Sequence, residues 1–189
     1  MKARVGFAIC GSFCTFNKIF GVIEDLVNDD YDIYPIMSLN AFSIDTRFGE
    51  AREHMKKLEN LCNKQIITKI TEAEPIGPQK LVDILVIAPC TGNTLGKLAS
   101  GITDTTVTMA TKSHLRNQRP VLIGVSTNDG LSASAKNIGL LLNQKNIFFI
   151  PMRQDDYVNK PCSIVADFTK TKLAINQALD YKQIQPILL

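Results

Sequence analysis

Short apolar runs alternate with longer amphipathic segments through most of the chain. The short runs are rich in β-branched residues and lie at 3–9, 32–37, 65–67, 84–88, 121–126 and 147–150. Apolar residues at helical spacing fill the segments between them, at Phe16–Val27, Glu50–Cys62, Thr94–Ser100, Thr105–Arg116 and Ala133–Asn143. The alternation predicts an α/β fold of three αβα layers, with a Rossmann-like, doubly wound parallel sheet of about six strands.

The end of the chain predicts one more helix and an apolar tail. Ser163 is the expected N-cap of a helix that runs to about Ala178. The tail Ile184–Leu189 would be costly to expose, so we expect it to dock on this subunit or another. Residues 72–80 are typical of an ordered surface loop. We therefore expect residues 1–189 to form a single domain, with residues 163–189 as its C-terminal helix and tail.

Composition and charge narrow the class of protein. Hydrophobic residues make up 45% of the 189 residues, enough for one sizeable core. The 21 basic and 18 acidic residues leave a net charge of +3, and the basic residues are scattered, which argues against binding to nucleic acids or membrane surfaces. No apolar run approaches the roughly 18 residues of a spanning helix, and Val5–Ile9 is too short for a signal peptide. We expect a cytoplasmic protein.

Cysteine and histidine positions do not favour a metal site. The five cysteines contain no Cys-x-x-Cys pair and are expected to be reduced thiols; they are Cys10, Cys14, Cys62, Cys90 and Cys162. His54 and His114 lie in separate helical patterns, and we expect both at the surface or at the boundary of the core. No metal is predicted.

Small polar residues follow four of the predicted strands. In open α/β sheets, ligands bind beyond the carboxyl ends of the strands. Glycine there allows close approach, and a hydroxyl at a helix N-terminus suits a phosphate, as in Gly11–Ser12. The same residue types also form ordinary helix caps, so one such loop is weak evidence; four at one edge favour a ligand site. The loop from Gly6 to Ser12 lacks the Lys of a P-loop and the third glycine of a dinucleotide fingerprint.

The string Ala88–Thr94, followed by Lys97–Ala99 and Gly101–Asp104, resembles the flavoprotein family that includes FMN-dependent cysteine decarboxylases and flavin prenyltransferases. The resemblance spans Val5 to about Ala178. It implies an FMN site, and trimers or multiples of trimers with sites between subunits. Phe13 and Phe16 are candidates to stack on the flavin, although Phe16 is more simply explained as core. The predicted cofactor-binding residues are Gly11, Ser12, Phe13, Ser38, Thr91, Gly92, Asn93, Thr94, Ser126 and Thr127.

Three segments resemble one branch of this family more specifically: Ala73–Pro78, Ala88–Thr94, and Gln154–Asp156 before Lys160–Pro161. Members of that branch are one component of a two-subunit enzyme in spore-forming bacteria. The enzyme oxidises a dihydropyridine dicarboxylate to the aromatic pyridine dicarboxylate, with NAD(P) as acceptor. The resemblance implies an NAD(P)-binding partner subunit, a small dicarboxylate substrate and the mother-cell cytoplasm as location.

Two departures from the wider family bear on activity. The decarboxylases carry a His in the loop before the fourth strand, where this chain has Ile76–Pro78. The prenyltransferases place an Arg-Glu pair after the fifth strand, where Ser126–Thr127 stands; without that cation an anionic leaving group would be poorly held. The alternatives that remain are a stand-alone FMN-dependent decarboxylase or flavin prenyltransferase-like enzyme, and a non-catalytic flavin-fold module that binds a partner.

Fixed cations would be needed to bind a dicarboxylate, because Arg pairs with carboxylates in a bidentate geometry. Arg47 is the favoured substrate-binding residue, since it follows the second strand's loop at the predicted ligand edge; a solvated arginine at a helix start is the alternative. Lys112, Arg116 and Arg153 are further candidates.

No residue can be assigned as catalytic from the sequence. Asp104 is a possible base, but its position is also that of an N-cap for a helix beginning at Thr105, and Asp129 and Asp156 are equally ambiguous. Cys10 and Cys90 follow the first and fourth strands, where a thiol would lie near the flavin, although buried structural thiols are the commoner explanation.

Overall fold

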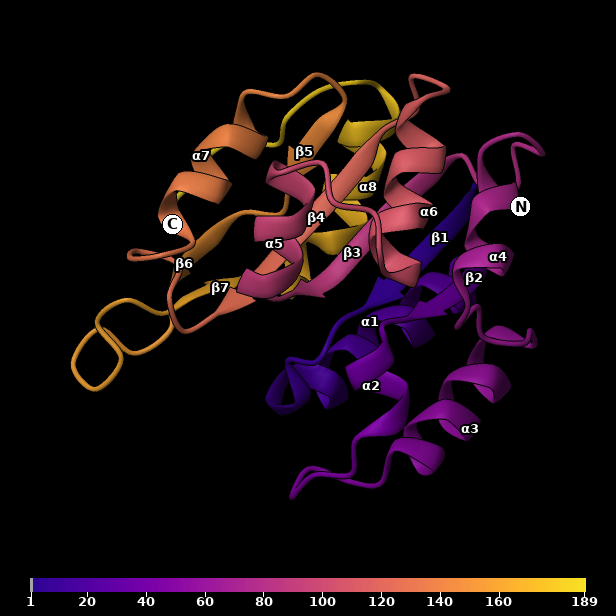
Figure 1. The fold of residues 1–189 in the computed structure, drawn as a ribbon, viewed down its shortest axis with the longest axis horizontal. Helices are drawn as coiled ribbons and strands as arrows, with labels where there is room; N and C mark the ends of the chain where they lie inside the picture. The colour runs from indigo at the N-terminus through magenta and orange to yellow at the C-terminus, as the bar shows by residue number, and fades with distance from the viewer. Residues whose placement is uncertain (1) are drawn as a thin grey trace.

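The computed structural model describes residues 2–189 as one mixed, mostly parallel sheet of seven strands between two layers of helices (Figure 1). The predicted three-layer α/β fold is confirmed. The strands are β1 (Arg4–Ile9), β2 (Asp32–Met37), β3 (Ile84–Cys90), β4 (Val121–Thr127), β5 (Ile147–Phe149), β6 (Met152–Gln154) and β7 (Ile164–Ala166). The α-helices are α1 (Phe16–Asn28), α2 (Leu39–Ser43), α3 (Ala51–Cys62), α4 (Ile70–Ala73), α5 (Gly92–Ala99), α6 (Thr106–Leu115), α7 (Ala135–Leu142) and α8 (Thr171–Leu179).

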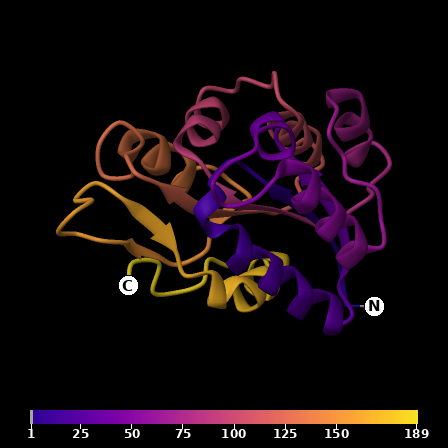
Figure 2. The same ribbon diagram turned by 90° about the horizontal axis from the view of Figure 1, so that it is seen from below.

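The central strands are buried on both faces, and their alternating side chains supply two cores. Phe7 of β1 packs with residues of α1, α3 and α8, whereas its neighbour Ala8 packs with residues of α5, α6 and α7. Figure 2 shows α1 and α8 together on one side of the sheet. Apolar residues at almost every position of β3 and β4 are what burial on both faces requires.

The strand order is β2-β1-β3-β4-β7-β6, with β5 also paired to β4. The chain moves outward from β1 to β2 and then returns to the other side of β1 with β3. This change of direction places a topological switch point between β1 and β3. The loops that follow β1, β3 and β4 all lie at the carboxyl edge beside it.

The region after β5 differs from the prediction. The expected helix start at Ser163 is wrong, because Ile164–Ala166 forms β7, which pairs antiparallel with both β4 and β6. The last helix, α8, begins at Thr171 with Lys170 as its N-cap, seven residues later than the predicted N-cap. β6, β7 and the loop between them form an arm that projects from the body (Figure 1). The apolar tail docks on this same chain, where Met152 exchanges backbone hydrogen bonds with Ile187 and Leu189.

Two other segments also differ. Residues 65–67 form no strand; Ile67 makes only an isolated parallel bridge with Ile36. The predicted loop at 72–80 is partly helical, through α4 and the 3₁₀ turn Glu74–Ile76, because Ala73 and Ile76 are buried against the core. Gly77 lies so close to Ser113 that an added Cβ would come within 2.0 Å of the Ser113 carbonyl oxygen. This close contact explains why residue 77 is a glycine.

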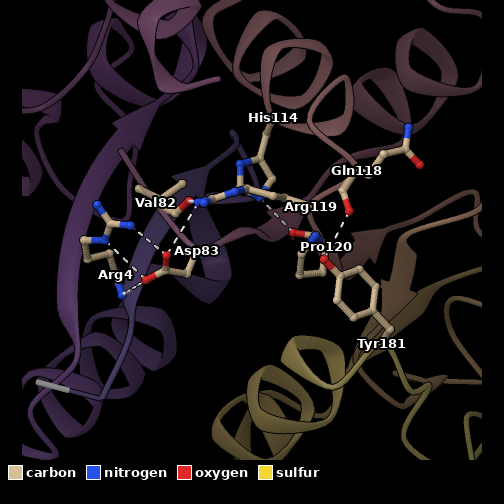
Figure 3. A network of polar contacts seen from close by, with 8 residues as sticks. All are labelled: Arg4, Val82, Asp83, His114, Gln118, Arg119, Pro120 and Tyr181. Atoms are coloured by element: carbon tan, nitrogen blue, oxygen red, sulfur yellow. Dashed lines mark hydrogen bonds and ion pairs between the residues drawn. The ribbon is translucent and has the colours of Figure 1, made fainter. Parts of the chain in front are cut away.

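A polar network covers the amino edge of the sheet, opposite the predicted ligand edge (Figure 3). Asp83 accepts hydrogen bonds from the backbone and guanidinium of Arg4, at 2.9 and 2.8 Å, and pairs with Arg119 at 3.5 Å. Arg119 also donates to the Val82 carbonyl, and the Tyr181 hydroxyl donates to the Gln118 carbonyl at 3.2 Å. The network ties β1, β3 and the start of β4 together.

Both histidines are buried, so the expected surface or boundary position is wrong. His54 packs against the rings of Phe16 and Phe20, with ring centroids 5.1 and 5.7 Å apart. The His114 side chain is fully buried, and its Nε2 hydrogen-bonds to the Pro120 carbonyl at 3.1 Å. Its Nδ1 has no hydrogen-bond partner among residues 2–189. Burial lowers the pKa of His114 to about 4.

The burial of neutral His114 predicts a loss of stability in mild acid. The unfolded chain takes up this proton near pH 6.5 and the folded chain only near pH 4, so stability falls as the pH drops between those values. Lowering the pH from 7.5 to 5.0 should therefore reduce the free energy of unfolding by about 2 kcal/mol through this group. Urea denaturation at both pH values gives the free energy of unfolding of the wild type and of His114→Gln. The variant, whose amide can still donate to the Pro120 carbonyl, should lose less stability between the two pH values than the wild type. Equal losses would show that His114 is not the cause.

Candidate functional site

A cleft of about 580 Å³ lies at the carboxyl ends of β1, β3 and β4. Its walls come from the loops after these strands, from the turn before α3, and from the β6–β7 arm. The lining residues are Gly11, Ser12, Phe13, Cys14, Thr15, Lys18, Arg47, Phe48, Thr91, Ser126, Thr127, Asn128, Asp155, Lys160, Ser163, Ile164 and Val165. Neutral hydroxyls, a few cations and an apolar portion therefore share one space.

Hydroxyl groups join the β1 and β4 sides of the cleft floor. The Ser12 and Ser126 Oγ atoms lie 2.8 Å apart, within hydrogen-bond distance, although 114 residues separate them in sequence. Thr15 Oγ1 donates to the Ser12 carbonyl at 2.7 Å and so fixes the turn that leads into α1. Gly11 lies beside the Phe13 ring and Asn40. These hydrogen bonds hold the turn in place.

The structure brings together seven of the residues predicted from the sequence: Gly11, Ser12, Phe13, Arg47, Thr91, Ser126 and Thr127. The other four stand outside the lining. Ser38 caps α2 by accepting from the Ala41 backbone at 3.4 Å. Thr94 is buried and donates to Cys10 Sγ at 3.4 Å, while Asn93 is exposed beside the cleft. Their roles in ligand binding stay predictions.

Gly92, the fourth of these residues, supports the cleft indirectly, through Asp129. The Asp129 carboxylate accepts from the Thr127 hydroxyl and, at 2.9 Å, from the Ser134 hydroxyl. This cluster lies against Gly92, where an added Cβ would come within 2.6 to 2.8 Å of oxygens on all three side chains. Because Thr127 lines the cleft, the close packing at Gly92 positions the Thr127 hydroxyl.

Three cations line the cleft, and sequence reasoning identified only Arg47. Arg47 stands in a tight turn in which Thr46 and Gly49 exchange backbone hydrogen bonds of 3.1 Å, and its guanidinium stacks on the Phe48 ring at 4.9 Å. Lys18 reaches the cleft from the first turn of α1, and Lys160 from the arm. Lys112, Arg116 and Arg153 do not line it.

The two thiols at the ends of β1 and β3 are buried beneath the cleft. Burial raises the pKa of the Cys90 thiol well above its ordinary value, whereas hydrogen bonds, first from Cys90 and then from Thr94, lower the pKa of Cys10. Both side chains are almost inaccessible and neither lines the cleft. They therefore belong to the packing of the site floor.

The acidic candidates have local structural partners. Asp104 forms an ion pair with Lys97 at 2.7 Å, and the cap of α6 is Thr105 rather than Asp104. Asp156 accepts from the backbone and side chain of Asn159 within the arm. Within residues 2–189, no group of three or more His, Cys, Asp or Glu side chains is placed to hold a metal ion. In the same range, no helix has the length and apolar content needed to cross a bilayer.

Comparison with known proteins identifies the family. The family model described as Flavoprotein matches residues 1–179. The chain belongs to the flavoprotein family. The match confirms the resemblance drawn from the loops after the first, second and fourth predicted strands.

Two relatives of this flavoprotein indicate a branch of the family. It is 46% identical over 185 residues to the B subunit of dipicolinate synthase from Bacillus subtilis, an alignment that covers 98% of this chain and 92% of that protein. The crystal structure of the dipicolinate synthase B subunit from Bacillus halodurans superposes with a TM-score of 0.91 at 39% identity, covering 100% of this chain and 96% of the other. This is the branch that Ala73–Pro78 and Gln154–Asp156 indicated.

A more distant structure shows how far the fold extends. An FMN-dependent cysteine decarboxylase matches with a TM-score of 0.65 at 22% identity, covering 94% of this chain and 97% of that chain. At that identity the likeness shows a shared fold.

Gly92 provides a test of how the site is packed. Gly92→Ala should destabilise the flavoprotein by about 1–3 kcal/mol, because the new methyl group must displace the oxygens of Thr127, Asp129 and Ser134. Gly96→Ala is the matched control in the same helix, since its nearest contact would be an ordinary 3.4 Å to Asn137, and it should be neutral or stabilising by up to about 1 kcal/mol. Urea denaturation compares the two; equal effects would contradict the close packing.

Proposed function

We propose that this flavoprotein is the B subunit of a dipicolinate synthase, which acts with an NAD(P)-binding A subunit in the cytoplasm of a spore-forming cell. The observation that carries the proposal is the 46% identity to the Bacillus subtilis B subunit over 98% of the chain. The cleft at the switch point supports it, because an alignment over 185 of the 189 residues must include most of the residues that line the cleft.

The cleft residues fit FMN. Its size lies within the range of small-molecule sites, and it combines hydroxyl donors with an aromatic ring. Ser12, Thr91, Ser126 and Thr127 would hold the polar parts of the cofactor, and Phe13 would contact the flavin. When bound, FMN supplies a two-electron acceptor.

The proposed reaction removes two electrons and two protons from a dihydropyridine dicarboxylate. The ring becomes the aromatic pyridine dicarboxylate, and NAD(P)⁺ on the A subunit becomes NAD(P)H with release of one proton. The contribution of this chain is to bind and orient the flat ring in the cleft and to exclude water from it. We assign no catalytic base to the chain.

The cleft does not favour a stand-alone decarboxylase or prenyltransferase. Ser126 and Thr127 line it where an Arg-Glu pair would be needed to hold a phosphate leaving group. The buried residue beside the 74–78 segment is Ser113, which binds the Gly77 backbone at 3.0 Å, and no histidine lines the cleft. Assembly with itself, as trimers or multiples of trimers, stays a prediction.

Flavin binding is the first test of the proposed function. Titration of the cofactor-free protein with FMN, followed by flavin fluorescence, should give saturable binding with a micromolar or lower Kd. Ser12→Ala should weaken it roughly tenfold, because the Ser12 hydroxyl that would hold the cofactor is lost, together with its hydrogen bond to the Ser126 hydroxyl. Ser100→Ala, at the far end of α5, is the matched control and should bind as the wild type.

The exposed Asn93 separates two versions of the site. Loss of binding in Asn93→Ala would extend the site to the exposed start of α5, whereas unchanged binding would restrict it to the residues that line the cleft. No FMN binding by the wild type would contradict the proposed cofactor.

Reconstitution tests the proposed reaction. The chain mixed with the A subunit should reduce NAD(P)⁺ in the presence of the dihydropyridine dicarboxylate, and either subunit alone should be at least about a hundredfold slower, since each would lack a group that positions the reactants. The absorbance of NAD(P)H reports the product formed. Full activity of the A subunit alone would reduce this chain to a binding module.

A further inference from the structure

The charges in the cleft are unevenly distributed between its walls. On the wall formed by α1 and the turn before α3, Lys18 and Arg47 both line the cleft. Neither side chain forms an ion pair with any residue between 2 and 189. This wall therefore carries two positive charges that are not paired with a counter-charge.

The nearby carboxylates do not supply that counter-charge. Asp45 is in the same loop as Arg47 but forms no ion pair with it; its carboxylate accepts from the Ala51 backbone at 2.8 Å, at the first residue of α3. The first turn of α1, from which Lys18 extends, contains no acidic residue. Both cations are thus left to face the cleft.

The opposite wall is close to neutral. Its cation, Lys160, pairs with Asp155 at 3.3 Å, and its other polar groups are uncharged: the hydroxyls of Ser126, Thr127 and Ser163 and the amide of Asn128. The apolar side chains of Ile164 and Val165 complete it. A ligand in the cleft would meet positive charge on one side only.

The Arg47 guanidinium has a defined orientation. It lies over the Phe48 ring at 4.9 Å, and the turn from Thr46 to Gly49 is closed by two backbone hydrogen bonds of 3.1 Å. A guanidinium held over a ring can still donate from its N–H groups to a ligand. These N–H groups match the two oxygens of a carboxylate.

We propose that Lys18 and Arg47 form a two-cation carboxylate clamp that recognises the dicarboxylate substrate and selects it over a monocarboxylate. Arg47 binds one carboxylate in bidentate fashion, and Lys18 supplies the second positive charge. The proposal rests on the proposed function and adds the residues that determine its substrate specificity. The hydroxyls of Ser12 and Ser126 remain for the cofactor.

The test is calorimetric titration of the FMN-loaded chain, alone and with the A subunit, with pyridine-2,6-dicarboxylate and pyridine-2-carboxylate. The wild type should bind the dicarboxylate at least tenfold more tightly. Arg47→Ala and Lys18→Ala should each weaken dicarboxylate binding by about ten- to a hundredfold and abolish the preference. Arg47→Lys keeps the charge but loses the planar guanidinium, so its affinity for the dicarboxylate should lie between those of the wild type and Arg47→Ala. Arg153→Ala, which removes an exposed cation of the arm that does not line the cleft, should change dicarboxylate binding less than about threefold.

A parallel titration with FMN and riboflavin separates the substrate from the cofactor phosphate. The clamp is supported if the Lys18 and Arg47 variants bind both flavins as the wild type does. Weaker FMN binding with unchanged riboflavin binding would show that the cations hold the phosphate, and would overturn the proposal.

The remaining outcomes also decide the clamp. Unchanged dicarboxylate binding in both variants would overturn it and leave the proposed cofactor standing. If the wild type binds no FMN, the proposed cofactor fails, and the same dicarboxylate titrations on the cofactor-free chain then support or overturn the clamp. Both side chains are exposed, so circular dichroism should show unchanged folding in the variants.

Discussion

Burial of both faces of β1, β3 and β4 is the constraint on which the rest of the structure depends. These strands run parallel between two helical layers, and almost none of their side chains contacts solvent. Their carboxyl ends must therefore lie side by side at one edge. Because the two cores hold the strands from both sides, the loops at that edge start from fixed positions.

The site inherits its geometry from these strand ends. Ser12 and Ser126 meet because β1 and β4 both flank β3, and the pairing of Ser126 and Thr127 with β7 attaches the arm at the same place. The arm in turn supplies the neutral wall of the cleft. The residues that bear on binding are thus far apart in sequence and close together in space.

Much of the fold could be predicted from the sequence, because long apolar runs such as 84–88 and 121–126 have few alternatives to buried strands. The short strands β6 and β7 could not. Met152–Gln154 contains the exposed Arg153, and the residues that lead into Ile164–Ala166 have the pattern of a helix start. Their pairing is decided by β4, which no local pattern shows.

The same limit applied to the site. Gly11, Ser12 and Thr91 each follow a recognisable strand and could be predicted. A lysine on a helix surface, such as Lys18, has the same sequence pattern whether it faces solvent or a cleft.

The Asp129 carboxylate beside Gly92 also fixes the direction in which a ligand can lie. A helix N-terminus usually attracts anions, but the start of α5 already has a carboxylate of its own, held there by Thr127 and Ser134. A second negative charge would be repelled from this end of the cleft. The start of α5 is therefore suited to uncharged groups of a ligand, including uncharged polar groups of the kind proposed for Thr91, and negative charge is favoured farther from Asp129.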